Sequence, residues 1–155
     1  SNPEIQNDAV RALGNWSDFA ASKPLLAIAT NKDAALNQYV LAVQGIVRLV
    51  KSVETEPAAK RVELAQAALN AARRDEEKKL ALSAFASVPD RKAAAALKPF
   101  LNDPSLKKEA CVAALSLAEA LAKPDKKTAK DLATAVKAAT DSKDLLKRAD
   151  KVLSK

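Results

Sequence analysis

The sequence predicts an all-α fold, and its composition gives three reasons. Alanine is the commonest residue, and aromatic residues make up 3% of a chain that is 48% hydrophobic, so the core consists of small and aliphatic side chains. Only two glycines are present, which leaves few positions for tight hairpin turns. Runs of Val, Ile and Thr, which strands prefer, are scarce. The 155 residues fit one domain, 1–155, whose core requires no disulfide or metal.

Helical periodicity covers nearly the whole chain and predicts nine helices. Several segments begin at residues that cap helix N-termini, such as Asp18, Asp33 and Asp90. Because the gaps are short, consecutive helices are expected to be antiparallel neighbours. The predicted helices cover residues 5–15, 18–30, 34–51, 56–72, 75–87, 90–102, 105–122, 126–139 and 142–154.

The predicted helices differ in how much of their surface is apolar. The third helix has one apolar face, formed by Leu36, Val40, Val43, Val47 and Val50 and widened by Tyr39, Ile46 and Leu49. Such a helix is covered on more than one side. The last helix has one apolar stripe, formed by Leu145, Leu146, Ala149, Val152 and Leu153. Basic residues cover its other face, as expected for the terminal cap of a helical stack.

An internal repeat is found when the chain is compared with itself at an offset of 72 residues. Asp18 then matches Asp90, and the apolar positions of the flanking helices coincide. The matched pairs are Leu13 with Phe85, Leu25 with Leu97, Ile28 with Phe100, Ala29 with Leu101, and Ala42-Val43 with Ala114-Leu115. Since four helices occupy this offset, it spans two helix-pair repeats. Repeats of this kind predict an α-solenoid of antiparallel helix pairs.

The repeat resembles the HEAT-like repeat of the phycobilisome-lyase type. The resemblance is carried by the segment 8–18, Asp-Ala-Val-Arg-Ala-Leu-Gly-Asn-Trp-Ser-Asp, which precedes Lys23-Pro24-Leu25-Leu26. The pattern recurs over residues 85–90 and 97–103, with Ala86 in place of Gly14. The match covers residues 5–122 and is weak over 123–155. It implies a curved stack of helix pairs and, most often, a protein-binding role; it implies no reaction. We expect a single right-handed α-solenoid of about four and a half HEAT-like repeats.

The beginning of the chain suggests a domain taken from a longer protein. It has no Met and starts with Ser1-Asn2, which we interpret as the remnant of a cleaved expression tag. In the repeat register, residues 5–15 form the inner helix of a pair whose outer helix is missing. Either upstream residues of the parent protein supply that helix, or this end of the stack is exposed.

A polar stripe is predicted on the concave side of the stack, where extended partners usually bind. Its side chains can form hydrogen bonds with an extended peptide or a phosphate-bearing ligand. The alternative interpretation is an ordinary solvated face. Arg11 also has a structural alternative, because the resemblance implies pairing with an Asp of a neighbouring turn. The predicted partner-binding residues are Asn7, Arg11, Asn37, Gln44, Arg48, Lys79 and Ser83.

The net charge of +7 makes nucleic acid or another phosphate-rich polyanion the alternative partner. The surplus lies entirely after residue 50, but acidic residues are interleaved with it and no aromatic platform for base stacking accompanies it. A solvating role for the lysines is therefore favoured. The basic candidates are Arg73-Arg74, Lys78-Lys79, Lys107-Lys108, Lys123, Lys126, Lys127 and Lys130.

Few residues are suited to catalysis. The chain has no His and one Cys, which excludes a Cys–His pair, a His base and the usual zinc sites. It also lacks a Gly-rich phosphate loop and a nucleophile elbow. Cys111 lies in an apolar run and is predicted to be a buried, inert thiol. The acidic run 75–77 is predicted to begin a helix, where the macrodipole favours negative charge.

We therefore expect a non-catalytic scaffold without cofactors, which binds a protein partner or flanking domains of its parent chain. A pure spacer between flanking domains is a third alternative. No apolar stretch approaches the roughly 18 residues of a membrane helix. Trp16 is predicted to close the end of the core, with an exposed anchor for a partner as the alternative.

Overall fold

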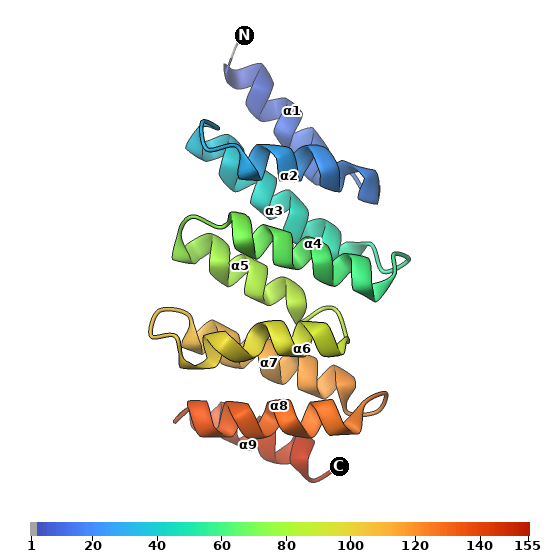
Figure 1. The fold of residues 1–155 in the computed structure, drawn as a ribbon, viewed down its shortest axis with the longest axis vertical. Coiled ribbons are helices and arrows are strands. Elements are labelled where there is room, and N and C mark those ends of the chain that lie inside the picture. The colour runs from blue at the N-terminus through green and yellow to red at the C-terminus, as the bar shows by residue number, and fades with distance from the viewer. Residues whose placement is uncertain (1–2) are drawn as a thin grey trace. The chain divides into compact units, whose positions relative to one another are not determined.

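The computed structural model describes residues 3–155 and is all-α in this range, which confirms the predicted class (Figure 1). Ser1 and Asn2, interpreted above as a tag remnant, lie outside the described residues. Nine α-helices and two short 3₁₀ helices are present among the described residues, and no strand occurs there. The chain divides into two compact units, Ser1–Ala84 and Phe85–Lys155.

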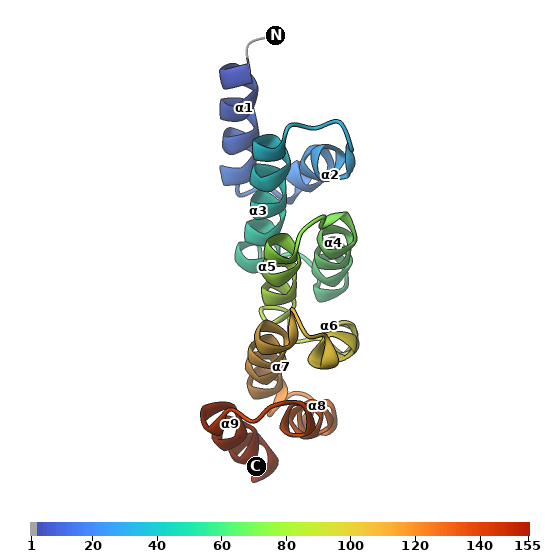
Figure 2. The ribbon, with the colours of Figure 1, turned by 90° about the vertical axis from the view of Figure 1, so that its left-hand side faces the viewer.

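The first unit arranges its helices in two layers. One layer contains α1, α3 and α5, and the other contains α2 and α4 (Figure 2). The helices are α1 (Pro3–Asn15), η1 (Phe19–Ala21), α2 (Ser22–Thr30), α3 (Leu36–Ser52), α4 (Ala58–Ala71) and α5 (Asp75–Phe85). The last residue of α5 belongs to the second unit. Helix α3 packs against α1, α2 and α4, so it is covered on more than one side as predicted.

Packing on several sides explains the burial along α3. Tyr39, Ile46 and Leu49 are completely buried, as are Val43 and Val50. Leu36, however, was predicted to lie on the same apolar face and is 56% exposed. This part of the prediction was wrong because Leu36 is the first residue of the helix, where neighbouring helices cover less of the surface.

Side-chain hydrogen bonds link helices of the same layer at regular intervals along the chain. Gln38 at the start of α3 donates to Gln6 at the start of α1, with 3.0 Å between Nε2 and Oε1. Lys51 near the end of α3 donates to Ser83 near the end of α5, with 2.9 Å between Nζ and Oγ. The partners are 32 residues apart in both cases. Because starts meet starts and ends meet ends, the helices within this layer run parallel.

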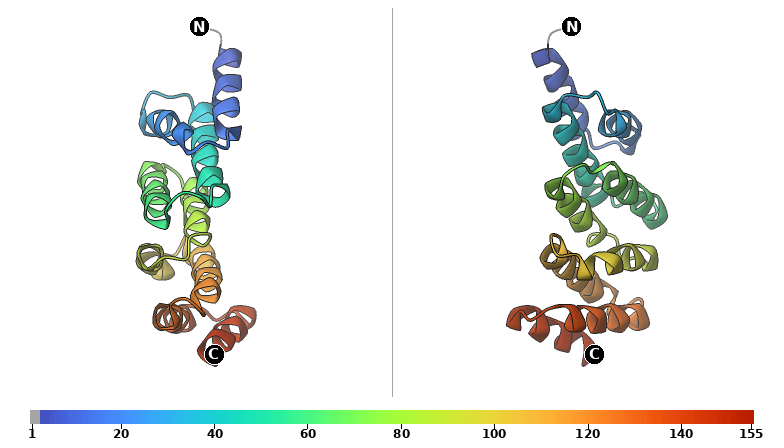
Figure 3. Two further views of the ribbon diagram at one scale, coloured as in Figure 1. Left: turned by 90° about the vertical axis from the view of Figure 1, so that its right-hand side faces the viewer. Right: turned by 60° about the vertical axis from the view of Figure 1, so that its left-hand side comes forward.

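The second unit also has two layers, and Figure 3 gives two further views of them. Helices α6 and α8 lie in one layer, and α7 and α9 in the other (Figure 2). Arg91 at the start of α6 pairs with Asp125 at the start of α8, 34 residues away. The helices are α6 (Arg91–Leu97), η2 (Lys98–Asn102), α7 (Lys107–Leu121), α8 (Lys126–Ala139) and α9 (Lys143–Leu153).

Helix α9 has the predicted single apolar face. Leu145, Ala149 and Val152 are buried, whereas Lys147 and Lys151 are exposed. Arg148 reaches from α9 to α7 and forms two hydrogen bonds of 2.9 Å with the Glu119 carboxylate. This pairing lowers the pKa of the carboxyl group below its usual value. Helix α9 thus packs against both α8 and α7, and a bidentate ion pair links it to α7.

Helix capping follows the predicted chemistry at several positions. The Asp18 and Asp90 carboxylates accept from the backbone N–H groups of Ala20 and Lys92, at 2.8 and 2.7 Å. These two caps are equivalent in the 72-residue register. Asp33 was predicted to cap the third helix, but that helix begins later and Ala35 occupies its N-cap position without a side-chain hydrogen bond.

Most apolar residues matched in the 72-residue register are also buried to the same degree, whereas Leu13 is only half-buried and its match Phe85 is completely buried. Leu25 and Leu97 are both completely buried, and Ala29 and Leu101 are buried to at least 97%. Ala42-Val43 and Ala114-Leu115 are likewise inaccessible. For most of the matched pairs, the offset found in the sequence therefore relates residues that occupy equivalent environments in the two units.

Candidate binding groove between helices α1 and α3

Helices α1 and α3 approach each other closely at the two glycines of the chain. A Cβ atom placed on Gly45 would lie 2.7 Å from the Gly14 Cα and 3.1 Å from a methyl carbon of Leu25. Both distances are shorter than van der Waals contact permits. Gly45 therefore lets the two helix backbones touch at this point, and neither glycine has a positive φ angle.

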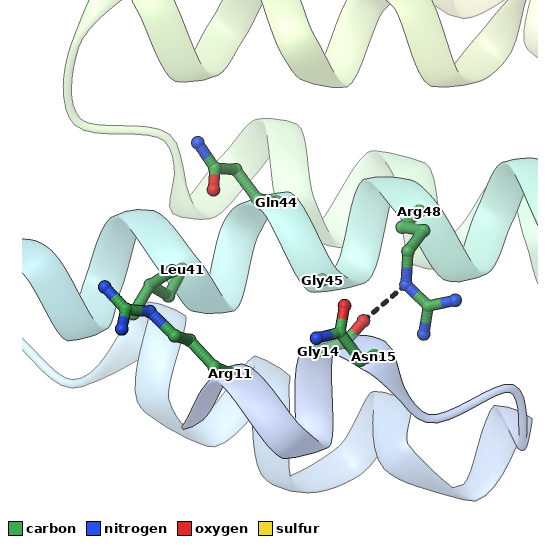
Figure 4. Close-up of a pocket in the computed structure, with 7 residues that line it drawn as sticks. All are labelled: Arg11, Gly14, Asn15, Leu41, Gln44, Gly45 and Arg48. Atoms are coloured by element: carbon green, nitrogen blue, oxygen red, sulfur yellow. Dashed lines mark hydrogen bonds between the residues drawn. The ribbon is translucent and has the colours of Figure 1, made fainter. Parts of the chain in front are cut away.

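Arg48 fastens the end of α1 to α3 next to this crossing. Its Nε donates to the Gly14 carbonyl (Figure 4). Its Nη2 donates to the Trp16 carbonyl. The Gly14 carbonyl belongs to the last turn of α1, where the carbonyl groups lack intrahelical partners and carry partial negative charge. Arg48 thus holds backbone oxygens, and no carboxylate is among its hydrogen-bond partners in the described structure.

Two hollows of about 330 and 520 Å³ lie between α1 and α3, and together they form what we call the α1–α3 groove. Their volumes are within the range of small-ligand pockets. Arg11 and Leu41 line both hollows, and Figure 4 shows them in the smaller one. The other lining residues are Gly14, Asn15, Gln44, Gly45 and Arg48 in the smaller hollow, and Asn7, Leu36, Asn37, Val40 and Arg74 in the larger.

The groove brings together five of the seven residues predicted from the polar stripe. The five residues are Asn7, Arg11, Asn37, Gln44 and Arg48. Whether they bind a partner stays a prediction. Arg11 was expected, as a structural alternative, to pair with an Asp of a neighbouring turn. It pairs instead with Asp8 of its own helix, with 3.6 Å between Nη1 and Oδ1. Both side chains are more than 60% exposed, so the pair contributes little stability.

The other two predicted residues, Lys79 and Ser83, lie on α5 and line neither hollow. Ser83 accepts the hydrogen bond from Lys51 described above, and its hydroxyl donates to the Leu80 carbonyl at 2.7 Å. Ser83 therefore connects α5 to α3. The predicted stripe is thus divided between the groove and the contact of α3 with α5.

Arg74 is a groove residue that was assigned only to the basic candidates for nucleic acid. Its guanidinium group forms two hydrogen bonds with Glu77, whose side chain is 2% exposed, and the Nε–Oε2 distance is 3.0 Å. The Arg74 hydrogen bond holds the pKa of the Glu77 carboxyl below its usual value. The acidic run 75–77 does begin α5 as predicted, but its third residue is also a buried ion-pair partner.

Arg73, the neighbouring basic candidate, packs on the other buried polar side chain of this region. Its guanidinium carbon lies 4.2 Å from the centre of the Tyr39 ring, and its backbone N–H donates to the Tyr39 hydroxyl at 2.6 Å. Burial raises the pKa of this hydroxyl. Arg73 also donates to the Asn31 carbonyl. Arg73 therefore fastens the start of α5 to the preceding helices, whereas Arg74 pairs with Glu77 in the first turn of α5 itself.

Trp16 does not close the core. Its side chain is 61% exposed, so this prediction was wrong, and the alternative of an exposed anchor stays a prediction. The turn after α1 is held instead through the backbone, because the Trp16 carbonyl accepts from Arg48. The sequence shows that a tryptophan lies in this turn, but it does not show that the backbone carbonyl of Trp16, and not its ring, contacts α3.

A third hollow, of about 450 Å³, lies in the second unit between α7 and the loop before α9. Lys107, Lys108 and Val112 line it together with Cys111. Cys111 is buried as predicted, and burial raises the pKa of its thiol. Burial and the raised pKa both disfavour the thiolate, which is the reactive form of cysteine.

No family model matches this chain, and neither a characterised protein nor a solved structure matches it significantly. No helix in the described part of the chain is long and apolar enough to cross a membrane. Fold and site define an all-α protein with a groove between two parallel helices.

Proposed function

We propose that this chain is a non-catalytic binding module that holds a protein partner in the α1–α3 groove. The observation that carries the proposal is the convergence of five predicted stripe residues on one groove, although they come from two helices about 30 residues apart in the sequence. Carboxamide side chains such as Asn37 and Gln44 can both donate to and accept from a peptide backbone. An extended segment of a partner protein therefore suits this surface.

The proposal includes an α-solenoid of HEAT-like repeats as the architecture. Three observations support it. Hydrogen bonds within a layer recur between residues 32 to 34 apart. The caps at Asp18 and Asp90 are equivalent. Most residues matched at the 72-residue offset share their burial. Stacked two-helix repeats require this regularity, because each repeat contacts only its neighbours.

Charge favours a protein partner over a polyanion for the groove. Residues 1–84 contain eleven basic and ten acidic residues, so this unit is almost neutral. A phosphate backbone requires many uncompensated cations over an extended surface. A short peptide can be bound by a few hydrogen bonds and a few local charges.

The alternative, binding of a phosphate-rich polyanion, is favoured by one observation in the second unit. Residues 85–155 contain fifteen basic and nine acidic residues. Several of these cations already pair with carboxylates, including Arg91 with Asp125 and Lys137 with Asp150. The alternative predicts binding that falls steeply with salt and involves the second unit.

A peptide-display experiment tests the proposal. A library of random twelve-residue peptides is selected on the immobilised chain, and the peptides obtained are titrated into ¹⁵N-labelled protein. We expect the backbone amide signals of α1 and α3 to shift. Selected peptides that shift only signals of residues 85–155 would contradict the proposal. So would a failure to select any peptide, and random oligonucleotides bound only at low salt would then favour the alternative.

A further inference from the structure

The α1–α3 groove has a positive local charge although its unit is almost neutral. Arg11, Arg48 and Arg74 line it, and none of its described lining residues is Asp or Glu. Arg74 is neutralised by the buried Glu77. Arg48 binds the carbonyl groups of Gly14 and Trp16, which bear no net charge.

Arg11 is the cation best placed to meet an incoming ligand. It lines both hollows, so a ligand in either one reaches it. Its one ion pair in the described part of the chain joins Nη1 to Asp8 over 3.6 Å, and both side chains are highly exposed. An exposed pair of this kind contributes at most about 1 kcal/mol, so a ligand carboxylate can compete with Asp8 for the guanidinium group. The planar guanidinium group of Arg11 could then donate two parallel hydrogen bonds to the ligand carboxylate.

The wall of the groove also contains a hydrogen-bonding group without a partner. Asn7 Oδ1 is shielded from solvent and forms no hydrogen bond in the described structure. A buried acceptor without a partner costs about 1–3 kcal/mol. Rotation of the carboxamide toward the groove would allow a peptide N–H to donate to it. Gln44, which is exposed on the opposite wall, can bind the peptide backbone from α3.

The larger hollow adds an apolar surface beside these polar groups. Leu36 is 56% exposed there and lies next to Val40 and Leu41 in the lining. Covering an exposed leucine with an apolar side chain of a partner removes apolar surface from water and therefore favours binding. A ligand with an acidic group alone would leave this surface in water.

The length of the groove limits the length of the ligand. The lining positions on α3 extend from Leu36 to Arg48, which is about 18 Å along a helix that rises about 1.5 Å per residue. An extended peptide covers about 3.3 Å per residue, so five or six residues fill the groove.

We infer that the α1–α3 groove binds an extended peptide of five or six residues that places an Asp or Glu carboxylate on Arg11 and an apolar side chain on Leu36. This inference rests on the proposed function and specifies the chemistry of the partner. The positive charge of Arg11 favours an acidic peptide segment. The apolar contact with Leu36 favours a peptide over a polyanion that has no apolar side chains.

Charge reversal of Arg11 provides the test. The random peptide library is selected in parallel on the wild-type chain, on Arg11→Glu and on Lys23→Glu, which changes the net charge equally on the exposed face of α2. Arg11→Gln is the second groove variant, because it removes the charge without repelling Asp8. Circular dichroism checks the helix content of all four proteins.

We expect wild type and Lys23→Glu to select the same consensus, with Asp or Glu near an apolar residue, and Arg11→Glu to select Lys or Arg at the acidic position. An acidic peptide from the wild-type selection is expected to bind Arg11→Gln at least tenfold more weakly, and to lose affinity as salt screens the pair. Peptides that shift α1 and α3 signals but are neutral, with affinity unchanged in Arg11→Gln, would overturn the inference and leave the proposed function standing. Failure to select any peptide would overturn both.

Discussion

Substituting Gly45 by Ala tests the packing that creates the groove. Residue 45 lies in the middle of α3, where Ala is preferred over Gly by about 1 kcal/mol in an isolated helix. Helix propensity alone therefore predicts that Gly45→Ala stabilises the protein. The tertiary contact predicts the opposite, because the added Cβ would lie 2.7 Å from the Gly14 Cα, a backbone atom that cannot rotate away.

The size of the effect follows from these two contributions. Relieving the contact requires α1 to move by up to about 1 Å, since ordinary carbon–carbon contacts begin near 3.5 Å. Overpacking of this kind costs about 1–3 kcal/mol, and a backbone neighbour places this case at the upper end. Subtracting the propensity gain leaves a net destabilisation of about 2 kcal/mol. Gly14→Ala is the matched control, because its Cβ would meet its nearest neighbours at 3.5 and 3.7 Å.

Urea unfolding followed by far-UV circular dichroism measures both variants. With a slope of about 2 kcal/mol per M, Gly45→Ala is expected to lower the unfolding midpoint by about 1 M. Gly14→Ala is expected to leave the midpoint unchanged or raise it slightly. A Gly45→Ala protein as stable as the wild type would refute the close crossing of α1 and α3. The description of the groove would then be wrong as well.

Three further predictions concern buried and paired groups. Glu77→Gln keeps the side-chain size but removes the charge that pairs with Arg74, so we expect a loss of about 2 kcal/mol in urea unfolding, and no loss would show that the pair is not formed. Pairing with Arg91 lowers the pKa of Asp125 from 3.8 to about 2, so its stabilising contribution is complete above about pH 5 and is lost as the pH falls through about 2. Asp125→Asn should therefore be less stable than wild type at pH 7, the difference should shrink as the pH falls below about 4, and a constant difference down to the lowest pH at which the protein is folded would contradict the pairing. Because Cys111 is buried with a raised thiol pKa, we expect negligible reaction with a disulfide reagent at pH 7 until urea unfolds the chain, and rapid reaction of the native protein would contradict this burial.

The chain's local patterns were sufficient to predict the fold class and most helix boundaries. The apolar stripe of α9 and the caps at Asp18 and Asp90 were predicted because each depends on residues within one or two helical turns. The 72-residue offset extended this local information to two equivalent regions. Cap prediction failed at Asp33, where the choice among several possible first residues depends on how the whole helix packs.

Only the tertiary structure decided which residues form the groove. Periodicity placed Leu36 on an apolar face, and the position of Trp16 in a turn suggested that its ring closes the end of the core. Both side chains are exposed, since burial depends on whether another helix covers the position. Periodicity also did not reveal that Gly45 meets Gly14, 31 residues away, or that Arg74 joins the groove from the start of α5. A local pattern specifies which side of a helix can be buried. The crossing point of two helices is specified only when their side chains pack against each other in space.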